Sequence, residues 1–259
     1  MEAHGSLLSG AHDWLALNAQ EARGAGLAVA LALELHAIQL GRSLQILFEM
    51  GYAEVAEAAT RAMVSAGVNV LAILRSDRDA VALQYLLYSA HRREVYLTNF
   101  VNNGLLTPEK RVAYDGEAAE LDARVLQEYR AKGIEPRQLG GNRTDTWSGL
   151  SDRALFEYAE ASPWYEIHYS PLSDGAHVSV AAISHELDGM GSGRIATGPR
   201  WSDPLLLIST SVDVIGHTLV TLAHQLNPKG VPDAQVVRTG AVEAVQRAFQ
   251  AATGQGHEE

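Results

Sequence analysis

Residues 164–177, WYEIHYSPLSDGAH, bring tryptophan, tyrosine, histidine and serine together in an otherwise alanine-rich chain. Pro163 suits the first turn of a helix, and a helix beginning there puts Tyr165 and Tyr169 at i and i+4 on one face. His168 lies beside them, three residues after Tyr165. Hydroxyl and imidazole groups donate and accept hydrogen bonds. We therefore predict that these side chains line a buried polar pocket.

The second half of the stretch contains a candidate acid–base group. Pro171 ends or kinks the first helix, and Ser173 and His177 follow at i and i+4, a spacing that permits contact. Histidine titrates near neutral pH, so His177 is the predicted general acid or base, with Tyr169 and Ser173 beside it. A hydrolase would also need an oxyanion hole and an orienting acid, which the sequence does not identify. The alternative is that these groups only satisfy backbone atoms at the broken helix ends.

A second set of polar side chains could hold a metal ion. Asp213, His217 and His224 follow one another at spacings that place them on one helical face, and an aspartate with two histidines can bind zinc or iron. No HExxH motif accompanies them, and the same face can be the polar side of an amphipathic helix. We predict no metal and no cofactor, and keep these three residues as weak candidates. The absence of cysteine excludes thiolate sites, disulfides and a cysteine nucleophile.

The overall charge bears on the partners of the protein. Among 259 residues, 20 are Lys or Arg and 31 are Asp or Glu, which gives a formal net charge of -11. This charge repels a phosphate backbone at long range. Nucleic acid is therefore not the expected partner. We expect a small-molecule ligand instead. The oligomeric state cannot be read from the sequence.

The sequence also bears on where the protein works. No stretch approaches the ~20 apolar residues needed to span a bilayer, since Glu34 and His36 interrupt the most apolar run, GLAVALALELHAIQL. The N-terminus lacks a basic segment followed by an apolar run and a cleavage site. We therefore expect a soluble, cytoplasmic protein without a membrane partner.

The elements that must position these side chains are helices. Apolar residues recur at three- and four-residue intervals over most of the chain, and few stretches alternate as strands do. We predict an all-α fold, a bundle of about nine or ten helices, in one domain spanning residues 1–259. Residues 1–22 are a candidate separate N-terminal helix, and residues 253–259 are a frayed tail.

Short polar motifs mark the expected helix boundaries. A serine or threonine cap followed by proline is a helix-start signal. It occurs at Thr107-Pro108, Ser162-Pro163 and, one residue further apart, Ser202-Asp203-Pro204. Gly51 and Ser76-Asp77 separate the first long helices, Asn227-Pro228 ends a later one, and a final helix runs from about residue 232 to residue 252.

Two long irregular segments interrupt the helices, at residues 133–150 and 189–200. Loops of this length in compact domains are often functional. The glycines of GMGSGR, in the second loop, follow a helix and not a strand, so they indicate a linker and not a phosphate-binding loop. The sequence does not show whether either loop covers the pocket.

The order of these segments resembles a known family. It runs through ATRAMVSAGVNVLAIL, DRDAVALQYLLYSAHRREVY, DTWSGLSDRALFEYA and WYEIHYSPLSDGAH. Together they resemble the bacterial family filed as domain of unknown function 5677, over about residues 30–225. The Trp-Ser-Gly motif with Tyr-x-x-x-Tyr-x-x-x-Ser-x-x-x-His is the most specific part. The matched positions are Arg61, Trp147, Tyr165, Tyr169, Ser173 and His177.

One position departs from the family pattern. The family typically has a glutamate four residues after the matched arginine, where this chain has Ser65, so an Arg-Glu couple is broken here or replaced from Glu49 or Glu57. The resemblance implies an all-helical fold and little about activity. The layout is also loosely similar to higher eukaryote and prokaryote nucleotide-binding domains, some of which are toxin ribonucleases. Those ribonucleases carry an arginine followed by a histidine five to seven positions later. No arginine in this sequence has a histidine at that spacing.

The leading hypothesis is that Arg61, Trp147, Tyr165 and His168 bind a small anionic or nucleotide-like ligand, with Tyr169, Ser173 and His177 as the candidate reactive groups. An arginine on a largely apolar helix needs a partner or an exit to water, so Arg61 would face the anion. A ribonuclease-like defence effector is one alternative. A non-enzymatic interaction module, whose polar cluster only stabilises the core, is the other. The residues do not decide whether a reaction is catalysed.

Overall fold

Every regular element among the described residues is helical. The computed structural model describes residues 2–170, 172 and 204–253. The long helices are α1 (Glu2–Asn18), α2 (Ala25–Glu49), α3 (Ala53–Leu74), α4 (Arg78–Asn102), α5 (Pro108–Ala131), α10 (Pro204–Leu226) and α11 (Val231–Thr253). The short ones are η1 (Ala19–Glu21), α6 (Asp152–Tyr158), α7 (Ser162–Trp164), the π-helical turn η2 (Tyr165–Tyr169) and η3 (Pro228–Gly230). Counting the nine α-helices and the π-helical turn η2, the described residues contain ten helices, so the predicted all-α fold with nine or ten helices is confirmed for this part of the chain.

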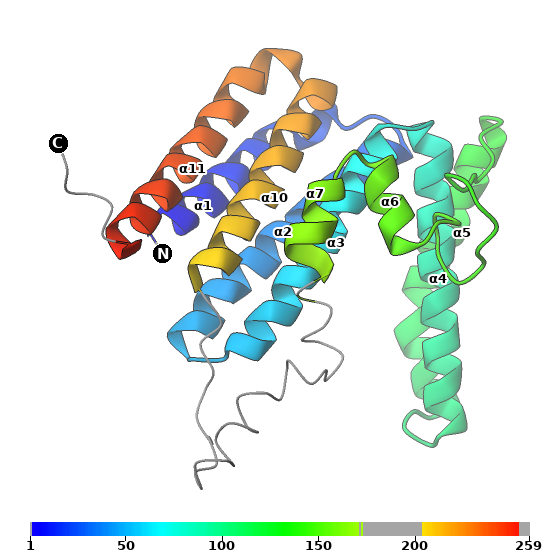
Figure 1. The fold of residues 1–259 in the computed structure, drawn as a ribbon. Coiled ribbons are helices and arrows are strands. Elements are labelled where there is room, and N and C mark those ends of the chain that lie inside the picture. Colours follow the sequence, from blue (N-terminus) through cyan, green and yellow to red (C-terminus); the bar gives the residue numbers. More distant parts are fainter. Residues whose placement is uncertain (1, 171, 173–203, 254–259) are drawn as a thin grey trace, which may run out of the picture.

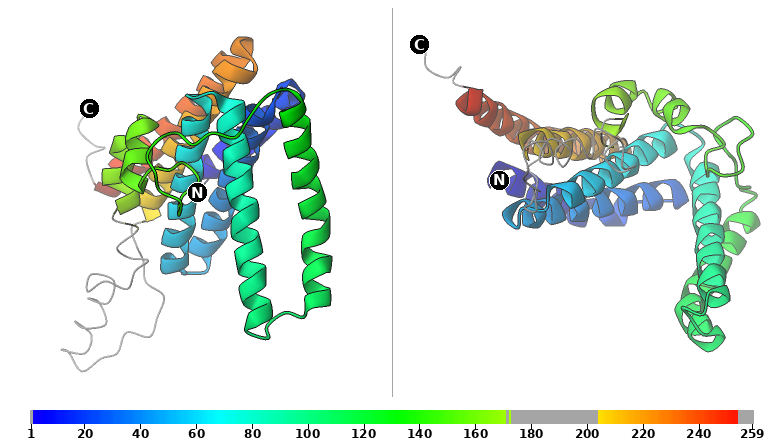
Figure 2. Two further views of the ribbon diagram at one scale, coloured as in Figure 1. Left: turned by 90° about the vertical axis from the view of Figure 1, so that its right-hand side faces the viewer. Right: turned by 60° about the horizontal axis from the view of Figure 1, so that its bottom comes forward.

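The helices form a bundle with a projecting hairpin (Figures 1 and 2). In the bundle, α2 packs along α3, α10 lies against both, and α1 and α11 pack on each other beside α10. Helix α4 starts against α2 and then leaves the bundle, and α5 returns alongside it. The short elements α6 and η2 pack on α3, so they lie where the hairpin departs.

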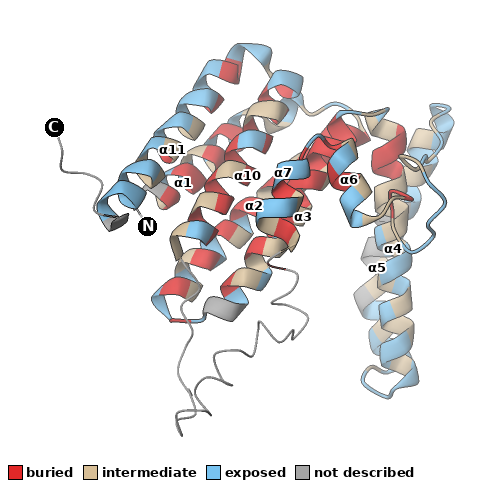
Figure 3. Ribbon diagram, in the orientation of Figure 1, coloured by how far each residue is buried: buried red, intermediate tan, exposed pale blue. Residues whose placement is uncertain are grey.

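Burial follows this division of the molecule (Figure 3). Apolar side chains of α1, α2, α3, α10 and α11 form one core. Helix α4 contributes buried residues only in its first turns, from Ala80 to Leu83. Burial of apolar surface is the main stabilising term in folding, so the bundle and not the hairpin holds the fold together.

The helix α1 is part of the bundle. His4 Nε2 lies 2.8 Å from the hydroxyl of Ser211 on α10. The indole of Trp14 donates to the carbonyl of Gly230, and Asn227 donates to the side chain of Asn18. These bonds join the N-terminal segment to the turn between α10 and α11.

Most boundary motifs mark helix ends as expected. The side chain of Thr107 accepts from the backbone N–H of Lys110 at 3.3 Å and caps α5. Helix α10 ends directly before Asn227-Pro228. The predicted serine cap at Ser162-Pro163 is wrong, because α7 already includes Ser162 and Ala161 occupies the cap position. Pro204 begins α10, while residues 202 and 203 lie outside the described part.

Three helices are long and apolar enough to cross a membrane, judged by length and composition alone. They are Ala25–Glu49, Val55–Leu74 and Pro204–Leu226. The prediction that no stretch approaches this composition is therefore wrong, because Glu34 and His36 are too few to offset the apolar residues around them. In the structure these helices pack on one another, and 44%, 61% and 61% of the three segments is buried. The cytoplasmic location stays a prediction.

Candidate functional site

A pocket lies where α2, α3, α4 and η2 meet. Its volume is about 460 Å³, within the range of small-molecule sites. We call it the Arg61 pocket. Its lining residues are Leu33, His36, Ala58, Arg61, Ala62, Ser65, Ala66, Asn69, Tyr85 and Tyr169.

Arg61 is the central cation of this pocket. Its Nη2 group donates to the hydroxyl of Tyr169 at 3.3 Å, and the guanidinium lies 5.0 Å from the centre of the Tyr169 ring. Arg61 forms no ion pair with any residue that the structure describes. A guanidinium carries five N–H donors in a fixed plane, so most of its donors remain for a ligand.

Tyr169 orients Arg61 instead of offering a proton to the pocket. Its hydroxyl donates to Asp152 Oδ2 at 3.0 Å and accepts from Arg61. Burial raises the pKa of this phenol, and the nearby Arg61 lowers it to a smaller extent. The hydroxyl therefore stays protonated at neutral pH. The proton of this hydroxyl is engaged by Asp152 in the structure, and the predicted role of Tyr169 as a reactive group stays a prediction.

The polypeptide around the two tyrosines is a π-helical turn. An α-helix was expected from Pro163, but α7 ends at Trp164, and the N–H of Ser170 bonds to the carbonyl of Tyr165, five residues back. Such turns are rare and occur often at functional sites. The rings of Tyr165 and Tyr169 stack, with centres 5.8 Å apart and planes at 27°. Tyr165 packs against Phe156 and below Arg153, so it supports Tyr169 from outside the pocket lining.

A second pocket, which we call the Arg92 pocket, adjoins the first along α4. Its volume is about 490 Å³. Its lining residues are Asn69, Tyr85, Tyr88, Ser89, Arg92, Arg93, Tyr96, Leu97 and Trp147. Asn69 and Tyr85 line both pockets, so the two pockets adjoin at these residues, and we refer to them together as the joined site.

Trp147, matched through the family resemblance, lies at the junction. Its indole N–H donates to Asn69 Oδ1 at 3.1 Å. Its ring meets Tyr85 edge to face, with centres 5.2 Å apart and planes at 78°. Burial raises the pKa of Tyr85. At this junction the Asn69 carboxamide is bonded to Trp147, and the Trp147 ring packs against Tyr85.

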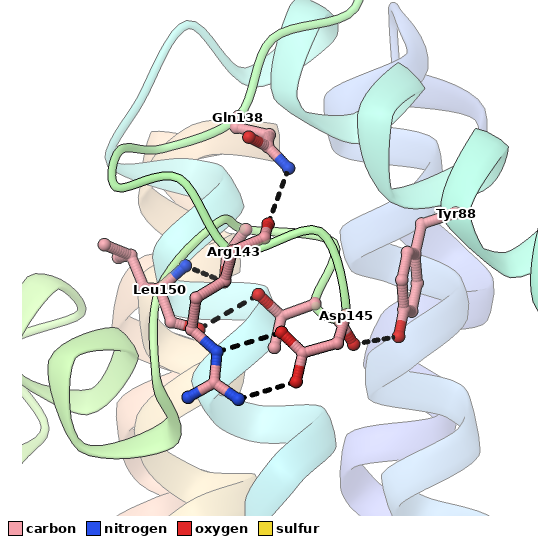
Figure 4. A network of polar contacts seen from close by, with 7 residues as sticks. Tyr88, Gln138, Arg143, Asp145 and Leu150 are labelled. Carbon is pink, nitrogen blue, oxygen red and sulfur yellow. Dashed lines mark hydrogen bonds and ion pairs between the residues drawn. The ribbon is translucent and has the colours of Figure 1, made fainter.

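The loop that carries Trp147 is held by polar contacts (Figure 4). The hydroxyl of Tyr88 on α4 donates to the carbonyl of Asp145. Arg143 pairs with the Asp145 carboxylate at 2.6 Å, and Gln138 donates to the carbonyl of Arg143. Of the two long loops, residues 133–150 therefore supply one wall of the site through Trp147. The second loop, residues 189–200, lies outside the described residues.

The charge of the joined site contrasts with that of the whole chain. In the described part, no acidic side chain lines either pocket, whereas Arg61, Arg92 and Arg93 do. Arg93 is bonded to Asp115 at 2.8 Å. Arg92 donates to the hydroxyl of Tyr96 and lies over that ring. The site is a locally cationic region on a chain of net charge -11.

Ser65, where the family pattern has glutamate, lines the Arg61 pocket. Its hydroxyl donates to the backbone carbonyl of Arg61 at 3.1 Å. A glutamate here would be one helical turn from Arg61 and could pair with it. The serine leaves the guanidinium available.

His168 belongs to a different cluster, on α10. Its Nδ1 lies 2.9 Å from the hydroxyl of Thr210, and its Nε2 lies 4.0 Å from Asp213. The Thr210 hydroxyl also lies 2.9 Å from the carbonyl oxygen of Leu206. Burial lowers the pKa of His168, and Asp213 opposes this shift. His168 thus joins η2 to α10 and is not among the residues that line the Arg61 pocket.

The weak metal candidates do not converge in the described part of the chain. Asp213 accepts from the indole of Trp164 at 2.8 Å and lies 3.9 Å from Arg238. His217 meets the edge of the Trp164 ring, and burial lowers its pKa, with a further contribution from Arg238. His224 is exposed in the last turn of α10. No group of three potential metal ligands occurs among the described residues.

Comparison with known proteins agrees with the helical layout and its motifs. A model described as a family of unknown function (DUF5677) matches residues 27–194. The chain belongs to this family. The match ends before the expected limit near residue 225, so it includes α2 to η2 and excludes α1 and α10. No curated protein and no solved structure matches the chain.

Within this DUF5677 chain, the predicted residues divide into three groups. Arg61, Tyr169 and Trp147 line the joined site, whereas Tyr165 and His168 pack beside it. Ser173 and His177 lie outside the described residues. Their predicted roles as reactive groups stay predictions.

Sequence reasoning missed Asn69, Tyr85 and Arg92. Asn69 stands in the apolar run VSAGVNVLAIL, where a carboxamide needs a hydrogen-bond partner. Tyr85 and Arg92 are seven residues apart, two turns along one face of α4. That face also carries Tyr88 and Tyr96. This row of tyrosines and an arginine was the feature of the sequence that could have indicated the site.

Proposed function

We propose that this protein binds a small anionic ligand in the Arg61 pocket. The observation that carries the proposal is the Arg61 guanidinium, which lines the pocket, is held by Tyr169, and has no ion-pair partner among the described residues. A partly buried charge is unfavourable unless it is paired. A planar guanidinium suits carboxylate or phosphate oxygens, which it binds with two parallel hydrogen bonds.

The surroundings of Arg61 support an anion over a cation or a neutral ligand. His36 and Asn69 line the same pocket, and no described acidic side chain does. Ser65 removes the intramolecular carboxylate that the family pattern would place beside the arginine. The pocket volume of about 460 Å³ suits a metabolite-sized molecule.

The two alternatives stated from the sequence have less support. A ribonuclease-like effector would depend on His177, which lies outside the described residues. An interaction module would need a polar cluster that is fully paired within the chain, yet most N–H donors of Arg61 have no partner in the described part. Small-ligand binding is therefore the function that the site supports best.

The proposal is tested by isothermal titration with inorganic pyrophosphate at low ionic strength, since salt screens exposed charges. We expect one pyrophosphate per chain, and an affinity about tenfold or more weaker in Arg61→Gln, which loses charge-assisted hydrogen bonds. Arg247→Gln is the matched control, because it makes the same charge change on the exposed face of α11. Equal affinity in wild type and Arg61→Gln, or no binding at millimolar pyrophosphate, would overturn the proposal.

A further inference from the structure

The junction between the two pockets has a carboxamide in a defined orientation. An indole N–H can only donate, so the atom of Asn69 that faces Trp147 at 3.1 Å must be its carbonyl oxygen. The bond therefore fixes which end of the amide is which. The Asn69 NH2 group is the end left for another partner, and it has none among the described residues.

Two aromatic rings stand beside this amide. Tyr85 and Trp147 contact each other edge to face, and both line the Arg92 pocket. The Tyr85 hydroxyl has no hydrogen-bond partner in the described part of the chain. Aromatic faces bind flat rings by stacking, and the gain is largely independent of which heterocycle stacks. An amide N–H donor next to such faces suits a heterocycle with an acceptor atom at its edge.

The cation and the junction lie on the same helix. Arg61 precedes Asn69 by eight residues on α3, a rise of about 12 Å, and both residues line the Arg61 pocket. A ligand that fills this pocket from end to end meets the guanidinium at one end and the amide with its aromatic rings at the other. Arg92 and Tyr96 then lie beyond the junction, in the adjoining pocket.

We infer that the joined site binds a nucleotide, with the heterocyclic base at Asn69, Tyr85 and Trp147 and the phosphates at Arg61. This inference rests on the proposed anion site and adds the class of ligand. The base stacks on the aromatic side chains and accepts from the Asn69 amide. The phosphates take the N–H groups of Arg61 that have no partner among the described residues. The chain's net charge of -11 does not oppose this, because a nucleotide meets only the local cationic surface.

The test compares ligands that share a diphosphate group and differ in the nucleoside attached to it. Titrations of wild-type protein use ADP, GDP, CDP and UDP, with inorganic pyrophosphate as the probe that has the anion and lacks the base. We expect at least one nucleoside diphosphate to bind about tenfold or more tighter than pyrophosphate, because stacking and one hydrogen bond are added. If pyrophosphate binds through Arg61 and all four nucleotides bind no tighter, the inference is overturned and the proposed function stands. If neither pyrophosphate nor any nucleotide binds, both are overturned.

Two variants locate the base. Asn69→Asp keeps an oxygen that accepts from Trp147 and loses the amide donor, so the preference for nucleotide over pyrophosphate is expected to fall about tenfold. Tyr85→Leu removes a ring from the site and is expected to lower the same preference. Tyr52→Leu, its control, removes an exposed ring that lines neither pocket, and is expected to bind as wild type does. A preference that is unchanged in both Asn69→Asp and Tyr85→Leu would overturn the placement of the base at this junction. The ratio measured in the wild type decides the ligand class even where a variant fails to fold.

Discussion

Nη2 of Arg61 donates to the hydroxyl oxygen of Tyr169 at 3.3 Å, joining two residues that are 108 positions apart in the chain. The same hydroxyl donates to Asp152, so one phenol connects the cation of α3 to the first turn of α6. Arg61 is a long side chain with much rotational freedom, which it loses when it is held in one position. Tyr169 therefore restricts the guanidinium to one orientation, as the proposed anion site requires.

The substitution Tyr169→Phe tests whether the Tyr169 hydroxyl orients Arg61. The ring and its stacking on Tyr165 remain, while both hydrogen bonds of the hydroxyl are lost, so the free energy of unfolding should fall by about 1 kcal/mol. Pyrophosphate affinity should fall severalfold, because the guanidinium is no longer oriented. Tyr158→Phe is the control, since the Tyr158 hydroxyl has no hydrogen bond among the described residues. Unchanged affinity in Tyr169→Phe would show that Arg61 needs no such support.

Ser65→Glu tests whether the unpaired state of Arg61 matters. A glutamate four residues after an arginine on one helix can pair with it, so the variant restores the acidic residue of the family pattern beside an intact Arg61. We expect pyrophosphate affinity to fall about tenfold or more in titration calorimetry. Ser65→Gln has nearly the same size without the charge and should retain most of the affinity. Equal losses in both variants would mean that crowding, and not charge, is the cause.

The sequence predicted helix boundaries well where the signal is local. Thr107 caps α5 through its own hydroxyl, and Asn227-Pro228 ends α10 because proline cannot continue a helix. The π-helical turn was not predictable, because nothing within Tyr165–Tyr169 marks a bond to the fifth residue back. Its rings instead pack against Phe156 of α6, a tertiary contact that spacing does not reveal.

The site was predictable in part. Arg61, Trp147 and Tyr169 were identified through the family motifs, which carry information about contacts between distant segments. Asn69 and Tyr85 were missed because their roles depend on where α4 leaves the bundle beside α3. A sequence pattern places Tyr85 and Arg92 on one face of α4, but only the fold shows which helix that face meets.

Gly149→Ala tests the loop that places Trp147. Gly149 has φ of +78°, and a Cβ there would lie 2.2 Å from the carbonyl oxygen of Gly140. The variant combines backbone strain with a collision against backbone, so we expect a loss of stability of about 2 kcal/mol or more. Gly104→Ala is the control, since Gly104 has φ of +69° and open space around it. Its loss should be about 1 kcal/mol, from strain alone. Equal urea midpoints for the two variants would contradict the tight packing of this loop.

Two buried titratable groups predict how stability depends on pH. Both carboxylate oxygens of Glu34 on α2 lack a hydrogen-bond partner among the described residues. The neighbouring Thr218 gives its proton to the carbonyl of Val214. Burial raises the pKa of Glu34 from 4.5 to about 8, and Thr218 opposes the shift only weakly. Burial lowers the pKa of His4 from 6.5 to about 4, with a smaller contribution from the N-terminal charge.

The sign of each contribution follows from these pKa values. Folded Glu34 binds a proton that the unfolded chain releases above pH 4.5, so its contribution is full below pH 4.5 and is lost as pH rises to about 8. Folded His4 rejects a proton that the unfolded chain takes up below pH 6.5, so its contribution is lost as pH falls toward 4. The two slopes cancel between pH 4.5 and 6.5. Above pH 6.5 only Glu34 acts, and stability falls.

Glu34→Gln separates this effect from every other titrating group, because the difference between variant and wild type contains only the changed site. The amide cannot ionise, so the variant should gain stability over wild type as pH rises from 4.5 to 8, by on the order of 4 kcal/mol in total. The measurement is a series of urea unfolding curves from pH 4.5 to 9 for both proteins. A constant difference between the two proteins across this range would show that Glu34 is ionised in the folded state or reaches water. Both explanations would contradict a neutral Glu34 carboxyl group in the core of the bundle.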